Sequence, residues 1–78
     1  MKQINGYVEN ITYRNEDNGY TVLTLSYGKK DIKCTGNFGY ISEGEYLEIE
    51  GEEVFHDIYG EQIKVKSYKV IPATDELS

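Results

Sequence analysis

Apolar and polar side chains alternate with a period of two residues in five segments of the sequence, and Gly, Asn and Asp separate these segments. A strand with one buried face repeats in this way, whereas an amphipathic helix repeats its apolar positions every three to four residues. The alternation is strictest where Leu47 and Ile49 are interleaved with Glu48 and Glu50. It predicts an all-β protein.

The first segment changes its apolar face partway along. Ile4 and Val8 share one parity, whereas Ile11 and Tyr13 share the other. A shift of one residue turns every following side chain to the opposite face of a strand, and a β-bulge is a common cause. We therefore expect a bulge at Glu9–Asn10, with Ile11 and Tyr13 facing inward after it.

The second segment follows a turn signal. Asn18 and Gly19 are residue types that accept a positive φ in a hairpin loop. The strand after them places Thr21, Leu23 and Leu25 on one face. Its other face is also partly apolar, so we expect cover on both faces.

The third segment is expected to turn Ile32, Cys34 and Phe38 inward. Gly36 within it marks a bend or a close approach of another part of the chain. The region from 39 to 44 breaks the alternation and is too short for a packed helix. It is predicted to be a loop or one short helical turn.

The last two segments are joined by the hairpin sequence HDIYGEQ. Ile63 is expected to face inward in the final strand, with Lys64 and Lys66 facing outward. We expect outward Glu48 and Glu50 to lie opposite these two lysines, where opposite charges contribute about 0.2–1 kcal/mol per pair.

Five strands, a bulged first strand, glycine bends and an irregular link between strands three and four fit a five-stranded Greek-key barrel of the OB type. An SH3-like barrel of similar length is the alternative. Pro72 ends the last strand because proline cannot donate to a strand ladder. The predicted OB-fold domain covers residues 1–72, and residues 73–78 form a polar tail or a linker to the rest of a longer protein.

The net charge of −6 limits the partners of this chain. Six of its fourteen acidic residues lie between Glu43 and Glu53. The average field therefore repels a polyanion, and DNA would be held only by a local patch. No apolar run approaches the roughly 20 residues of a membrane helix. A single cysteine excludes an internal disulfide, and no export signal follows Met1, so we expect a cytoplasmic protein.

The sequence contains no catalytic constellation and no metal-binding motif. Cys34 and His56 are the only cysteine and histidine, and zinc sites need such residues at close spacing. Cys34 alternates with Ile32 and is interpreted as a small core residue, whereas His56 is interpreted as a hairpin residue. Neither G-x-x-x-x-G-K-[ST] nor G-x-G-x-x-G occurs, so no phosphate-binding loop is expected.

The remaining candidate site is a face of the first three strands, the surface by which OB folds hold single-stranded nucleic acid. Bases stack on exposed aromatic rings for about 1–3 kcal/mol each, and basic side chains follow the phosphates. The alternative is that the same rings fill the core or a protein interface, which the neighbouring acidic residues favour. The residues of this possible nucleic-acid or partner face are Tyr7, Tyr13, Arg14, Tyr20, Lys29, Lys30, Lys33 and Phe38.

Three stretches in fixed order carry a family resemblance: GYVENITYRNEDNGYTVLTL, then TGNFGYISEGEYLEIEGE, then FHDIYGEQIKVKSY. Over roughly residues 3 to 72 the chain resembles the amino-terminal OB domain of the long RecD-like ATP-dependent DNA helicases, the exodeoxyribonuclease V alpha-like type that acts without RecB and RecC. The chain departs from that family at Glu53, where an aromatic residue is frequent, and at Ile63, where Phe is more usual. These two differences affect packing more than chemistry.

The resemblance implies that the chain is a noncatalytic part of a larger enzyme. The parent would bind ATP and magnesium, unwind DNA in the 5′ to 3′ direction, and act in repair or recombination, while this fragment would hold no cofactor. Its expected partners are the remaining domains of the parent helicase and, weakly, single-stranded DNA, with no membrane contact. The alternative function is a free-standing acidic OB-type module that binds another protein.

Overall fold

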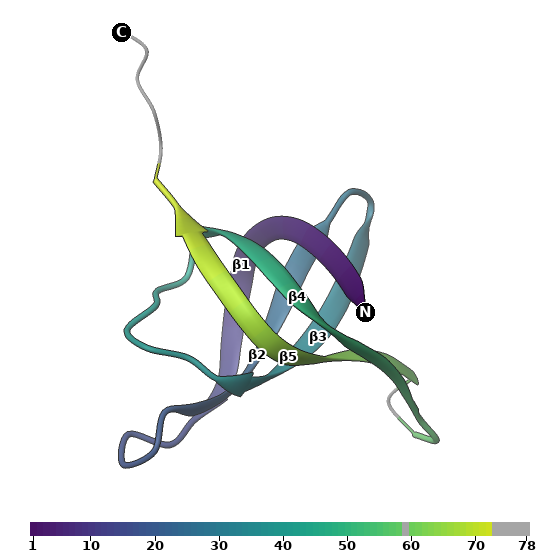
Figure 1. Cartoon of the computed structure of the whole chain (residues 1–78), viewed down its shortest axis with the longest axis horizontal. Coiled ribbons are helices and arrows are strands. Elements are labelled where there is room, and N and C mark those ends of the chain that lie inside the picture. The colour runs from purple at the N-terminus through teal and green to yellow at the C-terminus, as the bar shows by residue number, and fades with distance from the viewer. Residues whose placement is uncertain (59, 73–78) are drawn as a thin grey trace, which may run out of the picture.

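The computed structural model describes residues 1–58 and 60–72. Its five strands are β1 (Lys2–Arg14), β2 (Tyr20–Tyr27), β3 (Lys30–Asn37), β4 (Tyr46–His56) and β5 (Gly60–Ile71). They close into a barrel in the order β1-β2-β3-β5-β4, and β1 pairs with β4 (Figure 1). The β3–β5 pair is parallel and the other pairs are antiparallel. This is the OB-type Greek-key barrel, so the predicted fold class is confirmed.

Strand β1 is long because it serves two neighbours. Residues 2–7 pair with β4, and residues 7–14 pair with β2. The strand curls between these partners, and Gly6 lies where it turns: a Cβ there would be 2.9 Å from the carbonyl carbon of Ser26 and 3.1 Å from Leu25 Cγ. Only glycine permits this approach of two backbones, which closes the barrel at a small radius.

The predicted bulge in β1 is confirmed, and a second irregularity follows it. The register shifts between Val8 and Asn10 and again between Ile11 and Tyr13. The second shift restores the original alternation, so Tyr13 lies opposite Val22 and is 51% exposed. The expectation that Tyr13 faces inward was wrong because the sequence indicated only one of the two shifts.

Among the described residues, eleven buried hydrophobic residues form the core inside the barrel. They are Ile4, Val8, Leu23, Leu25, Ile32, Cys34, Phe38, Ile41, Leu47, Ile49 and Ile63. Every predicted inward residue of β2 and β3 is buried, and so are Leu47, Ile49 and Ile63. Ile41 comes from the link between β3 and β4, which contains turns and bends and no helix. The loop alternative for this region is therefore confirmed.

The predicted pairing of Glu48 and Glu50 with Lys64 and Lys66 was wrong. Glu48 lies opposite Lys69, and Glu50 lies opposite Ser67. The register shifts between Glu50 and Gly51, and Lys66 has no opposite residue on β4. This extra residue displaces the part of β5 that follows it by one position relative to β4.

Strand β5 passes close to one glycine on each of its two neighbouring strands, Gly36 on β3 and Gly51 on β4. A Cβ at Gly36 would be 3.0 Å from Val65 Cβ, and one at Gly51 would be 2.9 Å from the carbonyl carbon of Lys64. The close approach predicted at Gly36 is thus confirmed. Strand β5 ends at Ile71 before Pro72, as expected, and the predicted tail at 73–78 lies outside the described residues. The part of the chain that the structure describes contains no helix able to span a membrane.

Candidate nucleic-acid interface

The β1–β2 hairpin is shaped by hydrogen bonds from two asparagine side chains. Asn15 Oδ1 accepts hydrogen bonds from the backbone N–H groups of Asp17 (2.8 Å) and Asn18 (3.3 Å), and Asn18 Oδ1 accepts one from Tyr20 N–H (2.9 Å). Gly19 has a φ of 80°, and its N–H donates to the Asn15 carbonyl at 2.8 Å. Asn18 therefore acts through its side chain, because among the described residues only glycines have a positive φ.

This hairpin places two exposed tyrosines side by side on the surface of the barrel. Tyr13 lies near the end of β1 before the turn, and Tyr20 is the first residue of β2 after it. Their ring centroids are 6.5 Å apart at an interplanar angle of 56°. Tyr20 is 40% exposed and Tyr13 is 51% exposed. We call Tyr13 and Tyr20 the tyrosine pair. Both rings present apolar surface on which a planar base can stack.

Lys33 lies on the same outer face as the tyrosine pair. It is opposite Thr24 in the β2–β3 ladder, two positions from the Val22–Thr35 pair. Val22 in turn lies opposite Tyr13. A basic side chain on this face can approach a phosphate while bases contact the rings. Of the three lysines in the predicted face, Lys33 is therefore the nearest to the tyrosine pair along the strand ladder.

Arg14 also lies beside the tyrosine pair, and much of its guanidinium is already bound within the protein. Its Nη1 donates to Thr21 Oγ1 at 2.9 Å, and its Nε is 3.6 Å from a carboxylate oxygen of Glu16. The Arg14 side chain is only 20% exposed. Thr21 is buried and donates to the Gly19 carbonyl at 3.0 Å. Arg14 therefore holds the hairpin against β2, which leaves it less available to a phosphate.

The other two lysines of the predicted face lie at the opposite end of the barrel. Lys29 is an exposed turn residue between β2 and β3. Lys30 Nζ is 3.8 Å from Glu61 Oε1. Strand β2 has eight residues, so this end lies roughly 23 Å from Tyr20 at about 3.3 Å per residue. Sequence reasoning grouped these lysines with the tyrosines because it had no measure of position along the strands.

The remaining two aromatic residues are separate from the tyrosine pair. Tyr7 packs edge-on against Tyr46 with ring centroids 4.8 Å apart, where β1 pairs with β4. Phe38 is only 3% exposed and packs on Tyr68 at 4.7 Å. Including Phe38 in the binding face was wrong because a core ring offers no surface to a ligand. Tyr46 was missed because it lies far from Tyr7 in the sequence.

A pair of carboxylates limits the surface available to an anion. Glu9, at the first bulge, reaches Asp31 across β2. The protonated Glu9 carboxyl donates a hydrogen bond to Asp31, and this bond together with the charge of Asp31 raises the pKa of Glu9. Both residues are exposed. A phosphate would be repelled here, so the β1–β2–β3 face accepts a nucleic acid more readily at its tyrosine end.

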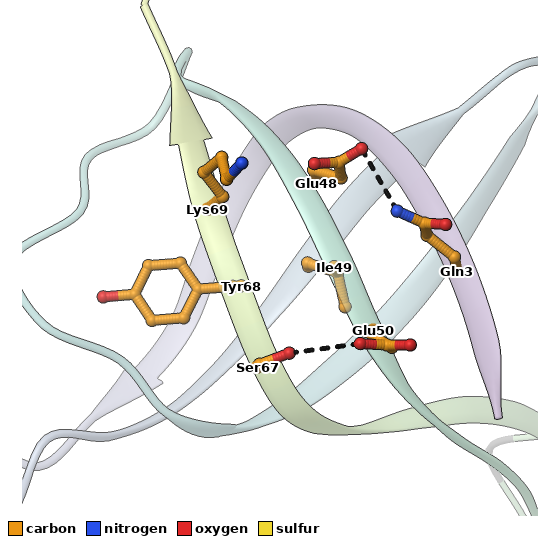
Figure 2. Close-up of a pocket in the computed structure, with 7 residues that line it drawn as sticks. All are labelled: Gln3, Glu48, Ile49, Glu50, Ser67, Tyr68 and Lys69. Carbon is orange, nitrogen blue, oxygen red and sulfur yellow. Dashed lines mark hydrogen bonds between the residues drawn. The ribbon is translucent and has the colours of Figure 1, made fainter.

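A polar depression between β1, β4 and β5 gives no support for a second nucleic-acid site. Gln3 Nε2 donates to Glu48 Oε2 at 3.1 Å, and Ser67 Oγ donates to Glu50 Oε1 at 3.5 Å (Figure 2). Lys69 also lines this depression. Two carboxylates against one lysine make this depression unfavourable for phosphate. Glu48 and Glu50 face outward, as the alternation predicts, and each accepts a cross-strand hydrogen bond.

The described residues contain no cluster of three or more His, Cys, Asp or Glu side chains arranged for a metal ion. Cys34 is buried, and desolvation raises the pKa of its thiol to about 12, so the reactive thiolate is scarce. His56 ends β4, and its Nδ1 accepts a hydrogen bond from Ile58 N–H at 3.1 Å. Both residues therefore have the structural positions predicted for them.

Comparison with known protein families identifies a matching family. A family model described as the OB-fold domain of the ATP-dependent DNA helicase YrrC matches residues 1–72. Comparison with curated proteins and comparison with solved structures each give no match.

Proposed function

The chain belongs to the family of OB-fold domains of the ATP-dependent DNA helicase YrrC, and on that premise we propose that it guides single-stranded DNA for a RecD-like helicase. The resemblance to RecD-like helicases found in the sequence agrees with this family. In the proposal, the domain is a noncatalytic module of a 5′ to 3′ helicase that acts in DNA repair or recombination in the cytoplasm. ATP and magnesium would be bound by the motor domains of the parent.

The tyrosine pair is the observation that carries this proposal. Two exposed rings on adjacent strands, with Lys33 on the same face, provide stacking surface and one cation. Stacking contributes about 1–3 kcal/mol per base, whereas the net charge of −6 opposes the approach of DNA. Binding should therefore depend more on the rings than on charge. A weak and dynamic contact of this kind suits a module that guides a moving strand.

The direct test is a titration of fluorescent oligothymidine at low and moderate salt. One or two phosphate contacts should give a slope of log affinity against log salt of about −0.7 to −1.4. Tyr13→Ala and Tyr20→Ala should each weaken binding by about fivefold to a hundredfold, which corresponds to about 1–3 kcal/mol. Tyr7→Ala is the matched control, because it removes an exposed tyrosine that packs elsewhere on Tyr46.

Two outcomes would contradict the DNA-guiding role. One is the absence of binding even at low salt, and the other is an equal loss of affinity in all three tyrosine variants. The helicase context has a separate test in the source genome, where the reading frame should continue into a G-x-x-x-x-G-K-[ST] motif. A natural stop codon directly after Ser78 would favour the free-standing interaction module instead.

A further inference from the structure

The outer part of strand β4 has a described neighbour on one side only. Pairing with β1 reaches Gly51, opposite Lys2, whereas pairing with β5 continues to His56, opposite Gly60. We call Glu52–His56 the edge segment. In Figure 1 it forms one side of the β4–β5 arm that extends past the barrel at the lower right. Unpaired strand edges of this kind can accept another strand.

The hydrogen-bonding direction of the edge segment follows from the alternation along β4. Where this strand begins, Gly44 N–H donates to the Val8 carbonyl at 2.8 Å, and Val8 N–H donates to the Glu45 carbonyl at 2.8 Å. Val8 thus directs both of its backbone groups toward β4, and because a strand alternates sides at each residue, Gly6, Ile4 and Lys2 do the same. Their partners Leu47, Ile49 and Gly51 therefore direct their backbone groups toward β1. Continued along the strand, the N–H and C=O groups of Glu53 and Phe55 point away from β5, toward the open edge.

Apolar side chains remain exposed around this edge. Phe55 is 78% exposed, and Ile58 at the tip of the arm is 79% exposed. Val54, whose side chain points to the opposite face of the strand from Phe55, is also exposed. Exposed apolar surface on both faces of one strand is typical of a site that another chain covers.

The charges near the edge define the kind of strand that fits. Glu50, Glu52 and Asp57 are exposed. Glu53 lies 3.3 Å from Lys2 Nζ, and Glu52 lies opposite Lys64. Glu61, opposite Phe55 on β5, lies 3.7 Å from Lys2 and 3.8 Å from Lys30. These acidic residues outnumber the three lysines beside them. A second copy of this chain would bring the same acidic edge and a net charge of −6, which disfavours self-pairing. A basic strand would be attracted instead, because charge can exclude one partner while it favours another.

We propose that the edge segment binds an extended basic segment of a partner protein, which adds to the barrel as a further strand beside β4. Glu53 and Phe55 supply the backbone hydrogen bonds, and Val54 and Phe55 contact apolar side chains on opposite faces of the added strand. Lys or Arg residues of that strand lie near Glu52 and Asp57. This recognition is β-strand addition, in which main-chain bonds give affinity and side chains give specificity. It uses a surface separate from the tyrosine pair and does not depend on DNA binding.

The test is an NMR titration of the isotopically labelled domain with the peptide acetyl-Thr-Ile-Val-Lys-Lys-Thr-amide. The backbone amides of residues 52 to 56 should shift, and the Glu53 and Phe55 amides should exchange with solvent more slowly in the complex. The matched control peptide carries Glu in place of both Lys residues, and we expect it to bind at least about tenfold more weakly.

Two changes separate the backbone contact from the side-chain contact. Phe55→Pro removes the N–H that faces the open edge, and proline is tolerated at such edge positions, so peptide-induced shifts should disappear. Phe55→Ala keeps the N–H and should weaken binding without abolishing it. If Phe55→Pro fails to fold, N-methylation of the peptide backbone at the amides that face β4 provides the same test on the unchanged protein.

Several results would overturn the proposal. These are unchanged amides at 52 to 56 with millimolar peptide, equal binding of the Lys and Glu peptides, or full binding by a folded Phe55→Pro variant or by the N-methylated peptide. Shifts of the same amides on raising the protein concentration alone would assign the edge to a second copy of the chain. Shifts of these amides with oligothymidine in place of peptide would assign it to nucleic acid.

Discussion

Replacing Gly6 by alanine tests the closure of the barrel at its tightest point. The new methyl group would meet the carbonyl group of Ser26, with its carbon atom 2.9 Å away, and would lie 3.1 Å from Leu25 Cγ. Carbon atoms pack favourably at about 3.5–4.0 Å. The Ser26 carbonyl belongs to the β2 backbone opposite Tyr7, so no rotamer change can move it away. One of the two strands must shift.

The expected cost follows from these contacts. Overpacking usually destabilises a protein by about 1–3 kcal/mol, and a clash with backbone belongs at the upper end of that range. The gain of about 0.5–1 kcal/mol that Ala has over Gly in a regular strand offsets only part of it. A net loss of about 2–2.5 kcal/mol is large against the roughly 4–12 kcal/mol expected for 78 residues. At about 4–8 °C per kcal/mol, Tm should fall by about 8–20 °C.

Urea and thermal unfolding followed by circular dichroism would measure this loss. Gly28→Asn is the matched control, because a Cβ at Gly28 meets no atom within 4 Å and its φ of 63° is one that asparagine accepts. The control should lose less than about 1 kcal/mol. Equal stability of the two variants, or a Gly6→Ala variant as stable as the parent, would refute the steric argument for barrel closure.

Two further predictions concern ionisable groups. Burial raises the pKa of the Cys34 thiol to about 12. Alkylation of Cys34 should therefore follow the rate of unfolding, and the free energy of unfolding should fall as pH rises above the ordinary thiol pKa. Labelling of the folded protein at the rate of a free cysteine would contradict this. The pKa of Glu9 is raised by its hydrogen bond to Asp31 and by the charge of Asp31. The contribution of protonated Glu9 to the stability of the folded state is therefore fully present below the ordinary Glu pKa, and it is lost as pH rises through the raised pKa of Glu9 in the folded protein. Asp31→Asn should return the Glu9 pKa toward its ordinary value in a carboxyl-carbon NMR titration, and an unchanged pKa would show that Asp31 is not the cause.

The strands and most of the core could be predicted because a period of two follows directly from strand geometry. Leu23, Leu25, Leu47 and Ile49 all lie where the alternation placed them. Phe38 was harder to place, because β3 ends at Asn37 and parity gives no direction beyond the end of a strand. Alternation predicts the buried face of a strand, and it is uninformative about the links.

The candidate site was predicted only in part, since register and position along the strands depend on the closed barrel. The shift between Ile11 and Tyr13 decides that Tyr13 lies on the surface beside Tyr20. The sequence around this shift contains no glycine or proline to mark it. Lys30 was grouped with these tyrosines, and its contact with Glu61 of β5 became visible only when strands distant in the sequence were brought together.

The parallel seam between β3 and β5 has a consequence for how the barrel assembles. It contains three register pairs, from Lys33–Gln62 to Thr35–Lys64, whereas the β1–β4 seam contains six. The other three strand pairs are hairpins or neighbours in sequence, which form over short loops, and non-local pairs must first overcome the entropy of loop closure. We therefore expect the β3–β5 seam to form last during folding and to open first in the native state. The barrel would then become an open sheet of five strands, held by the four remaining strand pairs, before global unfolding.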